Sequence, residues 1–422
     1  MKPDSVPHPA DLTRRSVLGV VVCTLMGCGG GGAADTAAVP LPTSTGSGGS
    51  GGSGGPSGGS GGGGGPSPGD TNVAGAPGTG GTGVTSHGAI SAFGSVVVNG
   101  IHYDELAARI SLDGVESTPA ALRLGMVATV QGTRDTSALL GTAQRIDVWS
   151  IAQGDIAQLS VQGNTAQFSV SNLSIVADVN TMLEGVSSLS ALRPGMRVTV
   201  WGLQTNTAAT QWRATRVATT SNSQVVTTGL LGSSPDAAVI NGWRLDGELP
   251  QGWKYGELMR AQGTLSAQGN TLRLDSCIPQ DFTAQAASGQ EVEVEGVITS
   301  APQNGHFKVG TVTIDARNLT GLPNLTVGME VEVKGTLSNG VLVAREFELE
   351  DESKLNTTEL EARIDQFTSL SNFVMRGQRC DASGVQRIEG GQASDLRVGL
   401  KIKVKGVRAG DTLMVSHIEI DH

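Results

Sequence analysis

The sequence predicts an all-β protein in which about five small β-barrel units follow a long Gly/Ser-rich linker. Three observations lead to this prediction. One strand motif recurs five times, and its apolar and polar residues alternate as in half-buried strands. Aromatic residues make up only 3% of the 422 residues, so several small aliphatic cores fit better than one large core. A chain of this length is expected to hold two or more domains.

Residues 1–28 have the pattern of an export signal. An Arg pair precedes an apolar run that is too short to span a bilayer, which takes about 20 residues. The run ends at Leu25-Met26-Gly27-Cys28, which resembles the lipobox of bacterial lipoproteins. That resemblance implies cleavage before Cys28 and acylation of its thiol, so we expect Cys28 to be the lipid attachment site. The route of export, general secretory or twin-arginine, stays open.

Residues 29–85 are expected to form a disordered linker. Gly, Ser, Pro, Thr and Ala dominate this segment, and such a composition cannot bury enough apolar surface to offset the entropy of ordering. A lipid at one end and folded units at the other would make it a tether. We therefore expect an extracytoplasmic protein that is lipid-anchored to the cell envelope. Because Gly29 follows Cys28, the outer membrane is the expected site in a Gram-negative cell.

The recurring motif consists of a Leu-rich turn, a glycine, an alternating strand and a second glycine seven residues after the first. The first glycines of four clear copies and one degenerate copy are Gly125, Gly195, Gly256, Gly328 and Gly399, spaced 70, 61, 72 and 71 residues apart. A constant period is the signature of internal repeats. These glycines are expected in tight turns that enter a strand, some of them with positive φ.

The alternation within each copy indicates antiparallel strands with one buried face. Residues 329–334 alternate apolar with charged side chains, and residues 400–405 alternate apolar side chains with lysine. About 65 residues and five or six strands in each unit predict a closed small barrel similar to the OB-fold. The expected repeats are 86–150, 151–222, 223–283 (degenerate), 284–353 and 354–422.

This pattern resembles the bacterial domain of unknown function family numbered 5666, whose members occur in tandem in exported proteins. The segment Gly88–Gly100, GAISAFGSVVVNG, and the Leu-x-x-Gly-Met entry to each strand carry the resemblance. It extends over residues 86–422 and is weakest in the third copy, around residues 225–282. The resemblance implies a tandem array of β-domains, and it brings no activity, cofactor or site residue.

The chain shows no catalytic or metal-binding constellation, so we assign no catalytic residue, metal or cofactor. Its six histidines are scattered without the spacing of metal ligands. For each of two rows of charged side chains, a structural role is weighed against a binding role. The alternating glutamates in 291–295 are expected at solvated strand positions rather than at a cation-binding edge. The lysines in 401–405 are expected to protect an edge strand rather than to meet an anionic partner.

Cys277 and Cys380 are the only cysteines outside the N-terminal segment. An oxidising compartment favours a disulfide between them. Because they fall in different repeats, two separately buried thiols are the alternative, and the sequence leaves both open.

The composition favours a binding or scaffolding module that is not catalytic. A net charge of -10 argues against nucleic acid as a partner. The expected partners are the membrane, through the N-terminal lipid, and an envelope polymer or protein. One alternative is an enzyme that processes envelope polysaccharide with carboxylates between repeats. A second is OB-like nucleic-acid binding, which needs stacked aromatics on a basic groove.

Overall fold

The computed structural model describes residues 82–135, 138–234, 236–350 and 357–421. All of these described residues fall within one compact unit. The predicted signal segment 1–28, with Cys28, lies outside the described residues, as does the predicted linker up to residue 81. Within the described residues no helix is long and apolar enough to cross a membrane.

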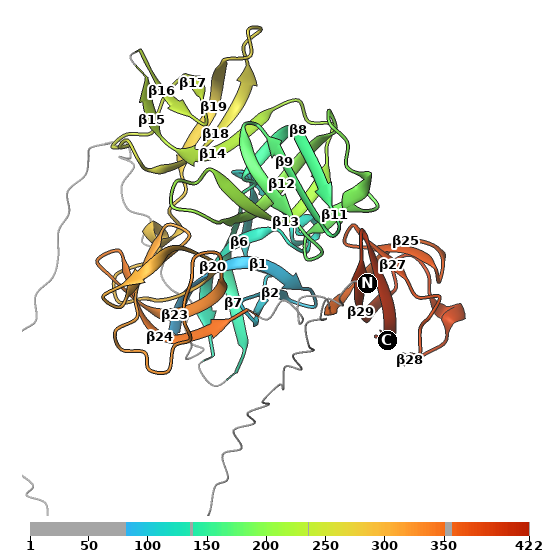
Figure 1. Ribbon diagram of the computed structural model, residues 1–422. Helices are drawn as coiled ribbons and strands as arrows, with labels where there is room; N and C mark the ends of the chain where they lie inside the picture. Colours follow the sequence, from blue (N-terminus) through green and yellow to red (C-terminus); the bar gives the residue numbers. More distant parts are fainter. Residues whose placement is uncertain (1–81, 136–137, 235, 351–356, 422) are drawn as a thin grey trace, which may run out of the picture. The chain divides into compact units, whose positions relative to one another are not determined.

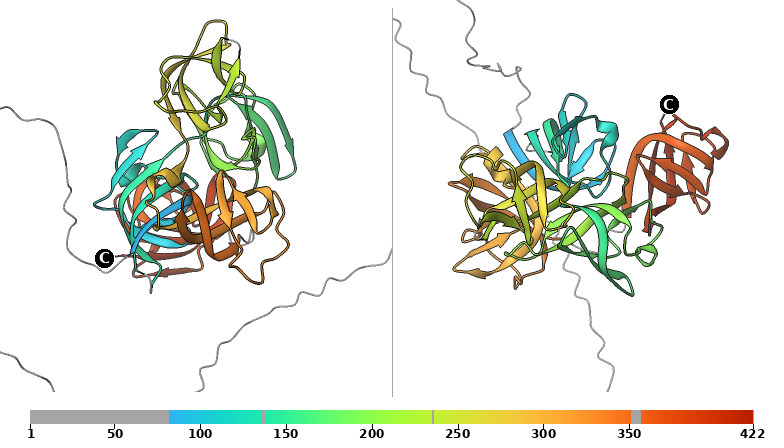
Figure 2. Two further views of the ribbon diagram at one scale, coloured as in Figure 1. Left: turned by 90° about the vertical axis from the view of Figure 1, so that its left-hand side faces the viewer. Right: turned by 90° about the horizontal axis from the view of Figure 1, so that it is seen from above.

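The described chain is built from strands, and its helical segments are single 3₁₀ turns. The prediction of an all-β fold with small barrels is confirmed, and Figures 1 and 2 show the strands of each repeat curling around a small core. Repeat 1 contains β1 (Thr82–Ala92), β2 (Val96–Val98), β3 (Ile101–Asp104), β4 (Arg109–Leu112), β5 (Val115–Ser117), η1 (Pro119–Ala121), β6 (Val127–Arg134) and β7 (Leu140–Val148). Repeat 2 contains β8 (Ala152–Gln162), β9 (Thr165–Val170), β10 (Leu173–Ala177), β11 (Met182–Glu184), η2 (Leu189–Ala191), β12 (Arg197–Gln204) and β13 (Gln211–Thr219).

The other three repeats follow the same order of elements. Repeat 3 contains β14 (Val225–Leu230), β15 (Gly232–Ser234), β16 (Ala237–Ile240), β17 (Trp243–Asp246), β18 (Leu258–Leu265) and β19 (Thr271–Pro279), and η3 (Phe282–Gln285) follows it. Repeat 4 contains β20 (Glu291–Gln303), β21 (His306–Val309), β22 (Val312–Asp315), β23 (Glu330–Ser338) and β24 (Val341–Leu349). Repeat 5 contains β25 (Thr357–Ser369), β26 (Asn372–Met375), β27 (Gln378–Asp381), β28 (Arg387–Glu389), η4 (Ala393–Asp395), β29 (Lys401–Ala409) and β30 (Thr412–Ile420).

Each repeat closes a ring of five strands in one order. In repeat 1 the ring runs β1, β2, β3, β7, β6 and back to β1, and only the step from β3 to β7 is parallel. Repeats 2, 4 and 5 close in the same way. Repeat 3 follows the same order with its first strand interrupted at Leu231, between β14 and β15. A five-stranded Greek-key ring of this kind is the architecture of the OB-fold.

The two glycines of the repeated motif have different structural roles. The first glycines adopt positive φ, between 76° and 97° in the five copies, so this prediction is confirmed. The second glycines lie at register shifts between the last two strands of each ring. A Cβ there would sit 1.8 to 2.3 Å from a carbonyl oxygen of the neighbouring strand. These second glycines are Gly132, Gly202, Gly263, Gly335 and Gly406.

The rings are joined into larger sheets by strands that pair across repeats. Strand β1 runs parallel to β20, which joins repeat 1 to repeat 4 in one sheet of twelve strands. Strand β8 pairs with β14, which joins repeats 2 and 3 in a second sheet of twelve strands. Repeat 5 forms a third sheet of six strands. It reaches repeat 1 through a bridge between Phe93 and Leu360, and both residues belong to one buried apolar cluster.

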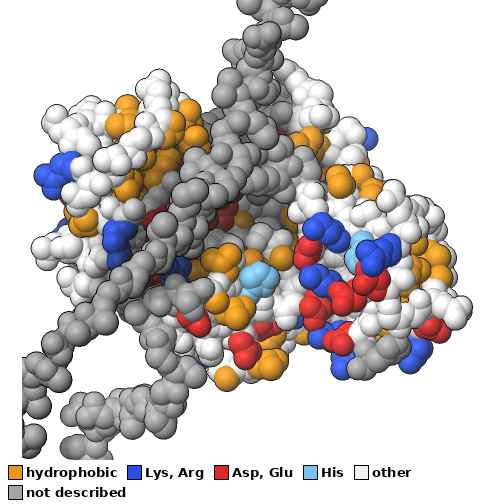
Figure 3. All heavy atoms as spheres, turned by 90° about the horizontal axis from the view of Figure 1, so that it is seen from below, with side chains coloured by type: hydrophobic (Ala, Val, Ile, Leu, Met, Phe, Trp, Pro, Cys, Tyr) orange, Lys and Arg blue, Asp and Glu red, His pale blue; other side chains and the backbone are white. Residues whose placement is uncertain are grey.

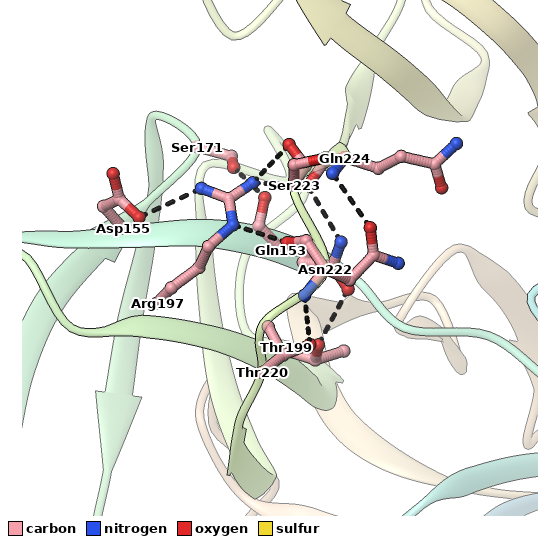
Figure 4. Close-up of polar contacts among 9 residues, drawn as sticks. All are labelled: Gln153, Asp155, Ser171, Arg197, Thr199, Thr220, Asn222, Ser223 and Gln224. Carbon is pink, nitrogen blue, oxygen red and sulfur yellow. Dashed lines mark hydrogen bonds and ion pairs between the residues drawn. The ribbon is translucent and has the colours of Figure 1, made fainter.

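Hydrogen bonds and ion pairs of polar side chains also stabilise junctions between repeats. Arg197 in β12 donates to the carbonyl oxygens of Asn222, Ser223 and Gln224, at 2.6, 2.7 and 2.6 Å, and these three residues connect repeats 2 and 3 (Figure 4). The same guanidinium lies 3.0 Å from a carboxylate oxygen of Asp155. One arginine side chain therefore holds the inter-repeat connection against the second ring.

The first strand begins earlier than the sequence predicted. Strand β1 starts at Thr82, inside the segment assigned to the linker that was expected to end at residue 85. Val84 is fully buried, and the residues from Val84 to His87 pair with β20. The short alternating stretch is ordered because strands on both sides of it, β6 and β20, satisfy its backbone groups.

Candidate functional site

Two strands of repeat 4 place a group of glutamates on the outer face of its ring. Strand β20 begins Glu-Val-Glu-Val-Glu and β23 begins Glu-Val-Glu-Val-Lys. The valines point into the core because strand side chains alternate between faces, which leaves the glutamates outside. The two strands are antiparallel, and their register sets Glu295 opposite Glu332 and Glu293 opposite Lys334.

The expectation that the glutamates of 291–295 are solvated is wrong for Glu293. Only 1% of its surface is exposed, because repeat 1 covers this part of β20. Ser86 of β1 donates a hydrogen bond to Glu293 Oε2 at 3.0 Å, and Lys334 Nζ lies 2.7 Å from Glu293 Oε1. Glu291 is paired with Arg134 at 2.9 Å. Arg and Lys side chains of the protein itself therefore pair with the glutamates in this part of β20.

Farther along the same face lies a cavity of about 200 Å³, which we call the glutamate pocket. Its walls come from repeats 1, 2, 4 and 5. Apolar side chains form part of the lining, namely Ala89, Ile90, Met182 and Ala214. Acidic and basic side chains form another part, namely Asp178, Glu295, Glu330, Glu332, Glu350, Arg213 and Arg408. Arg213 of repeat 2 forms an ion pair with Glu330 of repeat 4.

Burial and mutual repulsion raise the pKa of both facing glutamates. The pKa of Glu332 is raised to about 8 by burial and then by the nearby charge of Glu350 and Glu295. The pKa of Glu295 is raised to about 7 by burial and by Glu350, although its Oε2 accepts a hydrogen bond from the backbone N–H of Ala89 at 3.1 Å. Like charges directly opposite on a sheet repel each other, which favours the protonated forms.

Several oxygen atoms in the pocket have no hydrogen-bond donor among the described residues. They are Asn99 Oδ1, Asn180 Oδ1 and Thr215 Oγ1, and all three side chains line the pocket. Asn99 is only 5% exposed. A Cβ at Gly88 would lie 2.1 Å from Asn99 Oδ1 and 2.5 Å from Glu295 Oε2, so this glycine lets both oxygens approach the backbone. Buried acceptors without donors are uncommon in folded proteins and call for an explanation.

A second cavity, of about 90 Å³, is centred on an aromatic pair. The rings of His87 and Phe282 stack with centroids 4.2 Å apart, and His87 Nδ1 lies 3.0 Å from Thr129 Oγ1. Burial lowers the pKa of His87 to about 4, so the ring is neutral at physiological pH. Among the described residues, no group of three His, Cys, Asp or Glu side chains is arranged to hold a metal ion.

The lysines of 401–405 do not protect an edge strand, and this expectation is wrong. Strand β29 is paired on both sides, with β25 and with β30. Its lysines form ion pairs with nearby acids, such as Lys403 with Glu359 on β25 at 3.1 Å and Lys401 with Asp421, which follows β30, at 3.0 Å. On the face drawn in Figure 3, Lys and Arg side chains likewise lie next to Asp and Glu side chains.

Cys277 and Cys380 are free thiols, so the disulfide that the sequence left open is not formed in this structure. Cys277 is buried in the core of repeat 3, and Cys380 is buried in the core shared by repeats 1 and 5. Each thiol packs as a small apolar group in its own ring. The alternative of two separately buried thiols is the one that the structure has.

Sequence reasoning missed most of the glutamate pocket. It singled out Glu295 but not Glu332, Arg213 or Asn99. One signal was present: the Glu-Val-Glu-Val pattern occurs twice within repeat 4, at residues 291–294 and 330–333. Two such strands pair antiparallel and thereby set glutamates opposite each other. Nothing in the local pattern indicated that other repeats would cover them.

The rings and their junctions define the protein as an all-β tandem-repeat protein of OB-like barrels. Residues 153–218 and 295–348 match the model of the family described as Domain of unknown function (DUF5666). Repeats 2 and 4 are thus similar to DUF5666 domains, and the resemblance seen in the sequence is confirmed for these two repeats.

Other comparisons add little to this similarity. No curated protein matches the chain. Among solved structures, a chain described as "drosophila Unr CSD456" is 9% identical and aligns over 65% of this chain and 97% of its own length. Its TM-score of 0.13 is too low to support an argument.

Proposed function

We propose that this protein is a lipid-anchored binding protein of the cell envelope that is not an enzyme, and that its five rings form the framework for a ligand site between repeats. The observation that carries the proposal is the glutamate pocket, where repeats 1, 2, 4 and 5 meet around buried oxygen atoms that have no donor within the described part of the chain. Concave sites with apolar walls and a few convergent polar groups are typical of ligand binding.

The framework supports a preformed site. Strand pairing across repeats and buried side chains at the junctions restrict the movement of one ring against another. Arg260 of repeat 3, for example, is fully buried and lies 2.9 Å from Asp113 of repeat 1. A preorganised pocket lowers the entropy that is lost when a ligand binds.

The envelope location rests on the sequence. The lipobox-like segment that ends at Cys28 and the Gly/Ser-rich stretch after it support a lipid anchor and a tether. Mass spectrometry of the mature N-terminus tests this part, and we expect a diacylated Cys28 as the first residue. A Cys28→Ser protein that still partitions fully with membranes would contradict the anchor.

One observation favours the alternative of an enzyme acting on envelope polysaccharide. Glu295 and Glu332 form a close pair of carboxyl groups in a cavity between repeats. Acid–base catalysis of glycoside cleavage, however, needs two carboxyl groups whose pKa values are pushed apart, with one ionised and one protonated. Here burial and repulsion raise both pKa values, to about 7 for Glu295 and about 8 for Glu332, so the pocket does not push them far apart. Binding is the better supported function.

OB-like nucleic-acid binding has less support than either of these. It needs aromatic side chains on a basic groove. Trp201 and Trp212 are only 7% and 6% exposed, and the pocket between the repeats is rich in acids.

The decisive experiment is retention of envelope components on the full chain with Cys28→Ser, which keeps the protein free of lipid. We expect one component to be retained by this protein and to elute without chemical change. Turnover of an envelope glycan that is abolished by Glu332→Gln would overturn the non-catalytic assignment. Retention of nucleic acid in preference to envelope material would overturn it in favour of the OB-like alternative.

A further inference from the structure

We propose that the glutamate pocket binds an alkylammonium ligand, that is, a primary ammonium group carried on a short aliphatic stem. The proposal rests on the binding function proposed above and names the ligand class of the same site. Three properties of the pocket support it: its charge, its unpaired acceptors and its shape.

The charged side chains of the pocket leave an excess of acid. Among the residues that the structure describes, five carboxyl side chains line it, against two guanidinium groups, those of Arg213 and Arg408. Arg213 is engaged in its ion pair with Glu330. Lys334, which pairs with Glu332 at 2.9 Å, is shared with Glu293. A cation in the pocket would stabilise the ionised forms of Glu295 and Glu332, which otherwise repel each other.

The neutral acceptors fit a donor-rich ligand. Asn99 Oδ1, Asn180 Oδ1 and Thr215 Oγ1 are buried and receive no hydrogen bond from any residue that the structure describes. The Asn99 side chain is held in place, because its Nδ2 donates to the backbone carbonyl of His87 at 3.3 Å and this leaves Oδ1 for another donor. An ammonium group has three N–H donors and no acceptor, so it complements such a set of oxygens.

The shape and composition of the pocket select an organic cation over a metal ion. Ala89, Ile90, Met182 and Ala214 give the cavity an apolar wall that would contact carbon atoms of a ligand. A cavity of about 200 Å³ has room for several carbon atoms beside the charged group. The described residues contain no group of three His, Cys, Asp or Glu side chains suited to a metal ion.

The test is calorimetric titration of the full chain, with Cys28→Ser, with n-butylammonium chloride. We expect saturable binding of butylammonium and none of n-butanol, which has the same stem without the charge. Glu332→Gln and Asn99→Gly should each weaken binding at least tenfold. Glu248→Gln, at an exposed position in repeat 3 outside the pocket, should leave it unchanged.

Two variants keep the test decisive if one of them fails to fold. Glutamine has the shape of a protonated glutamate, and glycine readily adopts the φ of 52° that Asn99 has. Circular dichroism of each variant establishes that it is folded. If Glu332→Gln does not fold, Asn99→Gly alone decides the question.

Each other outcome overturns the proposal. Absence of saturable binding, equal binding of butanol, or binding that survives both pocket variants would show that the pocket is not an ammonium site. Calcium chloride that binds in the pocket and displaces butylammonium would assign it to a metal ion instead. The envelope-retention experiment distinguishes failure of the proposed ligand class from failure of the proposed binding function. If butylammonium does not bind but retention persists and is weakened by Glu332→Gln, the binding function of the pocket stands and only the ligand class fails. If retention fails as well, the proposed function fails with it.

Discussion

Glu295 on β20 and Glu332 on β23 lie directly opposite each other on antiparallel strands, with a third acid, Glu350, close to both. This arrangement is unfavourable when both side chains are ionised. The sheet accommodates it because burial and repulsion raise the pKa of both carboxyl groups. Proton binding and folding are therefore coupled at this position.

The first prediction is that thermal stability falls as the pH rises from 6.5 to 8.5. In the folded chain the pKa of Glu295 is about 7 and that of Glu332 about 8, whereas an unfolded glutamate titrates near 4.5. Over this window the folded state binds more protons than the unfolded state, so the free energy of unfolding falls. The slope is at most about 1.4 kcal/mol per pH unit for each carboxyl group. Unfolding midpoints measured at several pH values check this.

Between pH 6.5 and 8.5, the titration of His87 does not oppose the expected fall in the free energy of unfolding. Its folded pKa of about 4 makes stability rise with pH only up to about its ordinary value of 6.5. Glu332→Gln should flatten the profile between pH 6.5 and 8.5, and Glu248→Gln should not. A profile that rises over this window in the unmodified chain would contradict the raised pKa values of the two facing glutamates.

The second prediction concerns Arg260, which links repeat 3 to repeat 1. Its side chain is fully buried, lies 2.9 Å from Asp113, donates to the carbonyl oxygen of Ser150 at 2.8 Å and packs over the Trp149 ring. Breaking a buried ion pair from one side leaves an uncompensated charge. Arg260→Ala should lower the free energy of unfolding by about 3–5 kcal/mol in denaturant titrations.

Arg244 in the same repeat is the matched control for Arg260. Its ion pair with Asp236 is 3.7 Å long and exposed. Arg244→Ala should change stability by no more than about 0.5 kcal/mol. Equal effects of the two substitutions would show that Arg260 does not hold the junction.

The third prediction concerns the second glycine of the motif. A Cβ at Gly132 would lie 2.1 Å from the carbonyl oxygen of Thr142, a contact that only a shift of the backbone relieves. Gly132→Ala should therefore destabilise the chain by about 1–3 kcal/mol or more. A Cβ at Gly384 would meet no atom of the described residues within 4 Å, and its φ is not positive, so Gly384→Ala should stabilise by about 0.4–1 kcal/mol. If both substitutions shift the midpoint of thermal unfolding in the same direction, this role of the second glycine at the register shift is refuted.

The fourth prediction is that Cys277 and Cys380 are reduced and unreactive in the folded chain. Burial raises the pKa of Cys277 to about 11 and that of Cys380 to about 12, and thiolates are the reactive form. Iodoacetamide should modify neither residue at pH 7.5 without denaturant and both in its presence, as read by peptide mass spectrometry. A peptide pair that joins the two cysteines without reduction would instead establish the disulfide.

The ring architecture was predictable because the signals for it are local. The positive φ at the first glycines and the alternation in the strands that follow lie within a few residues of each other. The role of the second glycine was visible only as a recurrence. Its cause is a close approach to a neighbouring strand, such as that of Gly132 to Thr142.

The candidate site was far less predictable. Glu293 and Glu295 looked solvated because alternation alone places them on the face away from the core of their own ring. Their environment depends on β1, whose residues are about 200 positions earlier in the chain. The same applies to the lysines of β29, whose partners Glu359, in β25, and Asp421, just after β30, lie at either end of repeat 5.

Local sequence was thus sufficient for the repeat, the ring of strands and the turn glycines, since each repeat carries the complete pattern within about 70 residues. The pairing of repeat 1 with repeat 4, and of repeat 2 with repeat 3, was settled only by packing of the rings. Strand edges all present the same backbone donors and acceptors, so pattern alone does not specify which edges meet. The meeting of Asn99, Arg213 and Glu332 in one pocket follows from that choice of edges, because the three residues come from three different rings.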